Sequence, residues 1–125
     1  MEIIISNSSG IPIYEQIKEQ IKTKIVTREL HCGELLPSIR ALAKDLRVSV
    51  ITTKNAYEAL CKEGYVETVP SKGFYVAEIN HDIAREEQLN KIESLLDTAV
   101  DIAKTNNVSR QTLIDLLDIL YEEEK

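Results

Sequence analysis

Residues 36–60 read LPSIRALAKDLRVSVITTKNAYEAL, and this stretch decides the fold. Ser38 follows a proline, which cannot continue an earlier helix, so its hydroxyl can accept from the free N–H groups that open a new one. Apolar residues then recur at helical spacing, namely Ile39, Leu42, Ala43 and Leu46. The sequence therefore predicts a short helix that begins at Ser38 and buries one face.

A second helix is predicted directly after the first. The polar run 47–49 interrupts the apolar spacing, and Ser49 is a second candidate N-cap. Ala56 and Leu60, with Tyr57 beside them, form the apolar face of this helix. Its N-terminal end carries small hydroxyls, an amide and a cation, in Ser49, Thr52, Thr53, Lys54 and Asn55. Two short helices around a tight turn are typical of a helix-turn-helix.

The segment after the second helix is β-prone. Gly64 ends the helix, and residues 65–69 and 74–77 are rich in β-branched and aromatic side chains. The turn sequence Pro70-Ser71-Lys72-Gly73 joins them. The sequence thus predicts a mainly α fold with a small β-hairpin: a winged helix-turn-helix, with the helix pair at about 38–62 and the wing at 65–77.

The side chains at the start of the second helix suit insertion into the major groove of DNA. Ser and Thr can reach base edges or phosphates, Asn matches adenine, and Lys serves guanine or phosphate. A helix start that is merely solvated and capped by Ser49 is the alternative, and residue types alone do not separate the two. The hairpin that follows favours a double-stranded DNA operator as the partner.

The spaced residues of this region resemble the GntR family of bacterial transcriptional regulators. The resemblance is carried by Pro37-Ser38-x-Arg40-x-Leu42-Ala43-x-x-Leu46-x-Val48-Ser49, and then by Thr52, Ala56-Tyr57, Leu60, Gly64-Tyr65-Val66, Lys72-Gly73 and Val76. It covers about residues 11–79. It implies a sequence-specific DNA-binding regulator, most simply a repressor that occupies an operator and blocks polymerase.

Two departures from the family pattern bear on DNA contact. Many members have Arg directly after the turn Ser, where this chain has Val50, and the wing usually shows a first glycine where this chain has Ser71. Val50 can meet a thymine methyl but not a guanine, so the operator preference should differ. Ser71 is expected to adopt a less extreme backbone φ angle than a glycine at this position would. The residues predicted to contact DNA are Ser38, Arg40, Ser49, Val50, Thr52, Thr53, Lys54, Ser71, Lys72 and Gly73.

The residues before the helix pair are expected to support it. Residues 1–10 combine a β-prone Ile3-Ile4-Ile5 with a turn-rich connector, which indicates an arm or an edge strand. A DNA-binding domain at 11–79 would then open with a helix that begins near Pro12 and ends near Arg28. Its apolar residues fall at helical spacing, in Tyr14, Ile17, Ile21 and Ile25.

Residues 80–125 predict two amphipathic helices. The first begins at His81 and ends at 105–107, and Ser109 caps the second. Their apolar stripes contain Leu89, Ile92, Leu95, Leu96, Ala99, Ile102, Leu113, Leu116, Leu117 and Leu120. One hairpin cannot cover these faces, which predicts a homodimer through them; a monomer whose tail folds back is the alternative. The tail resembles the short dimerisation segment of the YtrA-type subfamily.

Charge is distributed unevenly along the 125 residues. The net charge is −6, yet residues 1–78 carry ten Lys/Arg against ten Asp/Glu, so all the excess acid lies in the tail. The tail should point away from DNA, whereas the proposed DNA face includes Arg40, Lys44, Arg47, Lys54 and Lys72.

No residue pattern indicates catalysis, a cofactor or a metal, so an enzyme is not predicted. Cys32 and Cys61 lack a CxxC spacing, and neither His31 nor His81 stands at ligand spacing from them. A winged helix that binds protein or RNA is the alternative class, and an added thiol, metal or small-molecule sensing role stays open, with no effector named. The sequence has neither a membrane-spanning stretch nor a signal-peptide start, so we expect a cytoplasmic protein.

Overall fold

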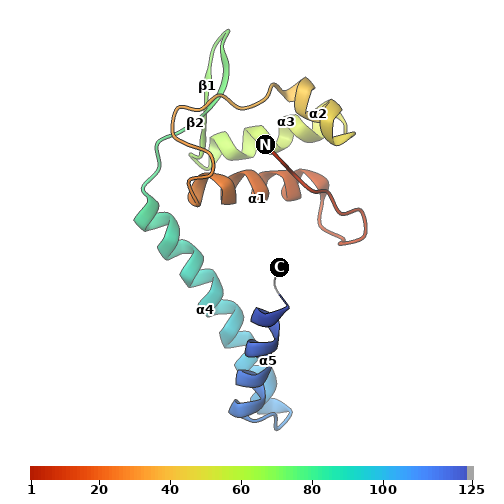
Figure 1. The fold of residues 1–125 in the computed structure, drawn as a ribbon, viewed down its shortest axis with the longest axis vertical. Helices are drawn as coiled ribbons and strands as arrows, with labels where there is room; N and C mark the ends of the chain where they lie inside the picture. The colour runs from red at the N-terminus through yellow and green to blue at the C-terminus, as the bar shows by residue number, and fades with distance from the viewer. Residues whose placement is uncertain (124–125) are drawn as a thin grey trace. The chain divides into compact units, whose positions relative to one another are not determined.

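Five helices and one β-hairpin follow one another along residues 1–123, the part of the chain that the computed structural model describes (Figure 1). In chain order they are α1 (Ile13–Val26), α2 (Ile39–Leu46), α3 (Val50–Lys62), β1 (Val66–Val69), β2 (Gly73–Val76), α4 (His81–Thr105) and α5 (Arg110–Glu122). This order confirms the predicted fold class, a winged helix-turn-helix followed by two helices.

The chain divides into two units, Met1–Ala84 and Arg85–Lys125. The first unit holds α1, α2, α3, the hairpin and the first turn of α4, and the second holds the rest of α4 together with α5. The domain boundary that the sequence suggested, between residues 79 and 80, stays a proposal.

Both predicted N-caps of the helix pair are confirmed. The Ser38 hydroxyl accepts from the Ala41 N–H at 3.1 Å, and the Ser49 hydroxyl accepts from the Thr52 N–H at 3.0 Å. Between them Arg47 adopts a left-handed conformation, with φ 58° and ψ 45°, which ends α2 and turns the chain. The two serine caps and the left-handed conformation of Arg47 together fix the short connection from α2 to α3.

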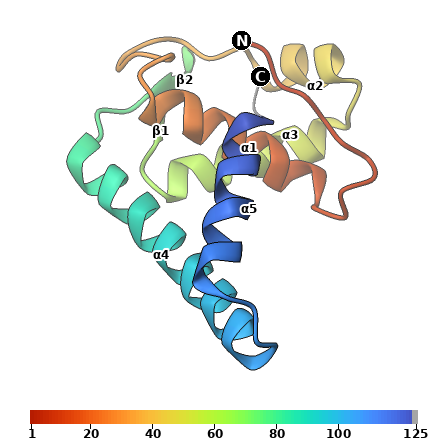
Figure 2. The same cartoon turned by 60° about the horizontal axis from the view of Figure 1, so that its bottom comes forward.

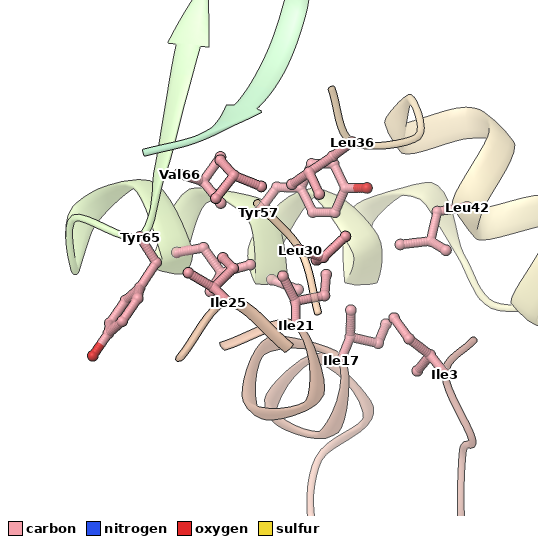
Figure 3. Close-up of a cluster of buried hydrophobic side chains, with 13 residues drawn as sticks. Ile3, Ile17, Ile21, Ile25, Leu30, Leu36, Leu42, Tyr57, Tyr65 and Val66 are labelled. Carbon is pink, nitrogen blue, oxygen red and sulfur yellow. The ribbon is translucent and has the colours of Figure 1, made fainter. Parts of the chain in front are cut away.

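The core of the first unit lies between α1 and α3, with α2 packed against α3 (Figure 3). From α1 it takes Ile17, Ile21 and Ile25, all at or below 2% exposure. The other buried members include Leu42 of α2 and Ala56, Tyr57 and Leu60 of α3. Since each large apolar side chain contributes roughly 1.5–3 kcal/mol on burial, this cluster holds the helix pair in place.

The wing is tied to the segment that leads into α2. Within the hairpin, β1 and β2 pair antiparallel from Val66 opposite Val76 to Val69 opposite Gly73. Residues 33–36 then run along the free edge of β2: the Leu36 N–H donates to the Phe74 carbonyl at 2.8 Å, and the Val76 N–H to the Glu34 carbonyl at 2.9 Å. The wing and the start of α2 therefore share one hydrogen-bonded network.

Residues 1–10 form an arm rather than a strand. Ile3 is buried against the core, while side-chain amides of α1 hold the arm backbone. Gln20 accepts from the Ile4 N–H at 2.9 Å and donates to the Ile4 carbonyl at 2.6 Å, and Gln16 makes the same pair of bonds to Ser6, both at 2.8 Å.

The two C-terminal helices begin at polar caps. The Asn80 side chain accepts from the N–H groups of Asp82 and Ile83 at the start of α4, and Ser109 accepts from the Thr112 N–H at the start of α5. A turn at residues 106–109 reverses the chain between the helices (Figure 2). None of the helices in residues 1–123 combines the length and apolar character that crossing a bilayer requires.

Candidate nucleic-acid interface

The first turn of α3 presents most of the side chains that were predicted to enter a DNA groove. Ser49, Val50 and Lys54 are exposed, and Thr52 is partly exposed. The Ser49 hydroxyl donates to the Thr52 hydroxyl oxygen at 2.8 Å, so the Thr52 O–H can still donate outward to an acceptor such as a phosphate or a base edge.

Thr53 requires a correction. This residue was predicted to contact DNA, but its side chain is 0% exposed and its hydroxyl donates to the Ser49 carbonyl at 3.2 Å. Thr53 lies on the same face of α3 as Ala56 and Leu60, which are also fully buried. In this structure Thr53 belongs to the core and supports the helix start from within.

Two exposed residues of α3 are absent from the predicted DNA-contacting set: Ile51, which the sequence did not single out, and Asn55, which was named as suited to the major groove but left out of that set. Ile51 is 66% exposed, and Asn55, one helical turn further on, is also exposed. Because residues four apart lie on one helix face, Ile51 and Asn55 form an outward ridge. The signal was present in the sequence: with Thr53, Ala56 and Leu60 inside, helical periodicity directs 51 and 55 outward.

The exposed cations of the helix-turn-helix differ from those of α1 in their partners. Within residues 1–123, Arg40, Lys44, Arg47 and Lys72 form no ion pair. Lys54 lies 3.8 Å from Glu58 in a pair that is more than half exposed on both sides, and such pairs contribute little. These cations are therefore available to phosphate.

The lysines of α1 are instead neutralised by carboxylates. The Lys18 ammonium lies 2.9 Å from Glu63 and 3.5 Å from both Glu15 and Glu19. The hydrogen bond to Glu63, reinforced by the charges of all three carboxylates, raises the pKa of Lys18 above its usual value despite some desolvation. The basic character of the first unit is thus concentrated on α2, α3 and the wing rather than on α1.

The wing tip requires a second correction. Ser71 was expected to need a less extreme backbone angle than glycine, yet its φ is 68°, in the left-handed region. The turn keeps the conformation that favours glycine although the side chain is serine. Lys72 beside it is exposed, whereas Gly73 is only partly exposed, and a Cβ there would come within 3.3 Å of the Leu35 side chain.

We expect Ser71→Gly to stabilise the first unit by about 0.5–1 kcal/mol. In the folded state, the left-handed conformation costs a non-glycine residue roughly 1–2 kcal/mol, and glycine removes this strain. In the unfolded state, the greater flexibility of glycine costs roughly 0.4–1 kcal/mol of stability, which offsets part of the gain. Urea unfolding measures the change. Ser8→Gly is the control, because Ser8 has no positive φ; equal effects at both positions would show that the Ser71 turn stores no strain.

A second exposed surface, which we call the apolar face of α4 and α5, lies in the C-terminal unit. Of the residues predicted to form a dimer interface, Ala99 and Leu113 are partly buried and the other eight are exposed, from 46% at Leu117 to 64% at Leu95 and Leu120. Val100, Ile114, Ile119 and Tyr121 are exposed apolar residues of the same two helices that were not among the predicted interface residues.

Comparison with protein families identifies the first unit. The family described as bacterial regulatory proteins, gntR family, matches residues 13–76, from the first residue of α1 to the last residue of β2. The chain belongs to the GntR family. The family match thus includes every structural element that carries the candidate DNA-contacting residues.

Among GntR-related proteins, the chain is similar to the HTH-type transcriptional repressor YtrA of Bacillus subtilis (strain 168). The two are 38% identical over 76 residues, which is 61% of this chain and 58% of YtrA. The matched region therefore spans little more than half the length of this relative.

Two solved structures extend the comparison. The crystal structure of a transcriptional antiterminator from Listeria monocytogenes EGD-e superposes with a TM-score of 0.73 at 27% identity, over 97% of this chain and 90% of that one. The DNA-binding domain of AraR, in complex with operator ORX1, superposes with a TM-score of 0.55 at 25% identity, over 62% of this chain and 96% of that one.

Proposed function

We propose that this GntR-family chain is a homodimeric, sequence-specific DNA-binding transcriptional regulator, most simply a repressor that occupies a two-fold symmetric operator. One observation carries the proposal: the exposed side chains at the start of α3 lie in the same unit as cations of α2 and the wing that form no ion pair within residues 1–123. The similarity to the YtrA repressor and to an operator-bound domain supports it. We propose no catalytic activity for the chain. We also propose that the protein is located in the cytoplasm, where the bacterial chromosome lies.

The proposed DNA contacts fall into two groups. Ser38, Arg40 and Lys72 would chiefly hold the sugar-phosphate backbone and set the orientation of the protein. The exposed residues of α3, namely Ser49, Val50, Ile51, Thr52, Lys54 and Asn55, would face the major groove and read base edges. Ser71 and Gly73 would shape the wing tip rather than contribute charge.

The proposed dimer forms through the apolar face of α4 and α5. So many exposed leucine and isoleucine side chains on two helices are unusual for a surface in water, and a second copy of the same chain offers an equally apolar face. A two-fold dimer presents two recognition helices to half-sites about 10 bp apart, or multiples of that spacing. The acidic excess of the tail then lies on the dimerisation segment and not on the DNA face.

The assignment of Arg40 and Lys54 is tested by salt titration. The wild type should bind an operator, obtained by selection from genomic fragments, with an affinity that falls steeply as salt rises. Arg40→Ala and Lys54→Ala should each weaken binding and, where phosphate is the partner, lower the slope of log affinity against log salt by about one unit. Lys62→Ala, at the far end of α3, is the control.

The same titration distinguishes the alternative class of function. A winged helix that binds protein or RNA would show neither operator preference nor a steep salt slope on duplex DNA. If both alanine variants bind operator as tightly as the wild type at every salt concentration, the assigned contacts are wrong.

Val50→Arg should shift base preference without altering dimerisation. The valine side chain has no hydrogen bond to give and suits a thymine methyl, whereas the arginine fork can meet O6 and N7 of guanine, a pairing worth roughly 1–3 kcal/mol of discrimination. Competition against a base-randomised operator should then favour G at one symmetric position in each half-site. An unchanged preference at every position would mean that residue 50 does not face the groove.

A further inference from the structure

Tyr57 is a recognition-helix residue that faces away from solvent. Its side chain is 0% exposed, and its hydroxyl donates to the Pro37 carbonyl at 2.7 Å (Figure 3 shows Tyr57 within the core). Burial raises the pKa of Tyr57 well above its ordinary value, so the hydroxyl keeps its proton and remains a donor. The bond joins α3 to a carbonyl twenty residues earlier in the chain.

The acceptor of this bond stands at the entry to α2. Pro37 directly precedes the N-cap Ser38, and Arg40 is the second residue of the helix. A fixed Pro37 carbonyl therefore fixes the direction in which the first turn of α2 leaves the core. Through this turn, the hydrogen bond of the Tyr57 hydroxyl sets the position of the Arg40 backbone relative to α3.

The ring of Tyr57 makes a second connection, to the wing. It meets the ring of Phe74 edge to face, with centroids 4.9 Å apart and planes at 73°, a favoured geometry for aromatic pairs. The Phe74 carbonyl in turn accepts from the N–H of Leu36, next to Pro37. Tyr57, Phe74 and the Leu36-Pro37 segment thus form a closed ring of three contacts between α3, β2 and the entry to α2.

We propose that Tyr57 is a positioning residue for operator recognition: it locks Arg40 and the wing to the recognition helix in one geometry without touching DNA. The inference rests on the proposed DNA-binding function. It predicts that loss of the hydroxyl changes how well the cations of α2 and the wing act together with α3, since a mobile cation must be ordered on binding.

The test is a double-mutant cycle with the full-length chain. Tyr57→Phe keeps the ring and removes the hydroxyl, and should lower affinity for the selected operator about five- to tenfold. Because Arg40 is proposed to hold phosphate, affinity for a duplex of scrambled sequence should fall as well, together with the slope of log affinity against log salt. Combined with Arg40→Ala, it should cost less than the product of the two single effects, because Tyr57 acts through Arg40. Tyr65→Phe is the matched control, a buried tyrosine whose hydroxyl makes no hydrogen bond within residues 1–123.

Each outcome decides a separate claim. If the wild type shows no preference for any sequence, the proposed function fails before Tyr57 is tested. If the wild type is specific and Tyr57→Phe either matches it or simply multiplies with Arg40→Ala, the positioning role is overturned. Should Tyr57→Phe melt below the assay temperature, the cycle of Phe74→Leu with Lys72→Ala decides instead: coupled losses support the ring of contacts, and independent losses overturn it.

Discussion

Changing Ile92 and Leu96 together to Glu is expected to convert the proposed dimer into monomers and to lower operator affinity by about 100-fold or more. Both residues are just over 50% exposed on α4 and four residues apart on one face. In a dimer they would bury like charges without partners, which is strongly unfavourable. Loss of the second recognition helix removes an effectively intramolecular contact worth roughly 10²–10⁴ in affinity. Sedimentation and operator binding measure the two effects.

The control for this experiment adds the same charges to the opposite face of α4. Asn90→Glu with Ser94→Glu has the same spacing and the same change in net charge, and both side chains are exposed. This variant should remain dimeric. A well-folded Ile92→Glu, Leu96→Glu protein that sediments as the same dimer would overturn the interface, and a monomeric wild type at assay concentrations would overturn the dimer itself.

Thr53→Lys should destabilise the first unit by about 3–5 kcal/mol, enough to unfold many small domains at 25 °C. The ammonium would be placed where a side chain is fully buried beside Ala56 and Leu60, and none of the carboxylates within residues 1–123 belongs to this buried core. The loss of the Thr53 hydroxyl bond to the Ser49 carbonyl adds to the cost. Urea unfolding followed by circular dichroism gives the difference in free energy.

Asn55→Lys is the matched control for the register of α3. It introduces the same ammonium two residues further along the same helix, at an exposed position, and should change stability by less than about 0.5 kcal/mol. Comparable losses at 53 and 55 would mean that the two residues share the same environment, and that the inward face of α3 is misplaced.

The architecture followed from local signals that act over a few residues. Each of the serines Ser38, Ser49 and Ser109 caps a helix within one residue of the predicted start, because a hydroxyl can satisfy a free N–H only at that position. Apolar spacing likewise identified the inward face of α2, and that of α1 at Ile17, Ile21 and Ile25, but it wrongly included Tyr14, which is 38% exposed. Such features depend on the nearest neighbours in the chain, so sequence alone is sufficient for them.

The wrong predictions for Thr53 and Ser71 arose where the type of a single residue was given more weight than its place in the helix or turn. Thr53 was assigned to DNA because its hydroxyl suits a base or a phosphate, although its spacing to Ala56 and Leu60 placed it inside. At Ser71 the residue type suggested an ordinary angle, but the tight turn of the hairpin imposes φ 68° whatever the side chain. In both cases the neighbouring structure overruled the preference of the single residue.

Long-range contacts had no signal in the sequence. The acceptor of the Tyr57 hydroxyl is a main-chain carbonyl, which every residue possesses, so nothing in the residue types marks Pro37 as the partner. The same holds for the strand-like pairing of 33–36 with β2, which follows from the path of the folded chain. Only the three-dimensional arrangement shows that α2, α3 and the wing are connected in this way.

The glutamine clasp on the N-terminal arm makes the folding unit longer than its family signature. The signature begins at residue 13, but Ile3 is a member of the core, and the side chains of Gln20 and Gln16 hydrogen-bond to the backbone of Ile4 and Ser6 beside it. A shortened chain that starts where the signature starts would lack Ile3, which lies beside Ile17 in the core (Figure 3). The N-terminal limit of this domain therefore lies in the arm that the α1 side-chain amides hold, upstream of the residues by which its relatives are recognised.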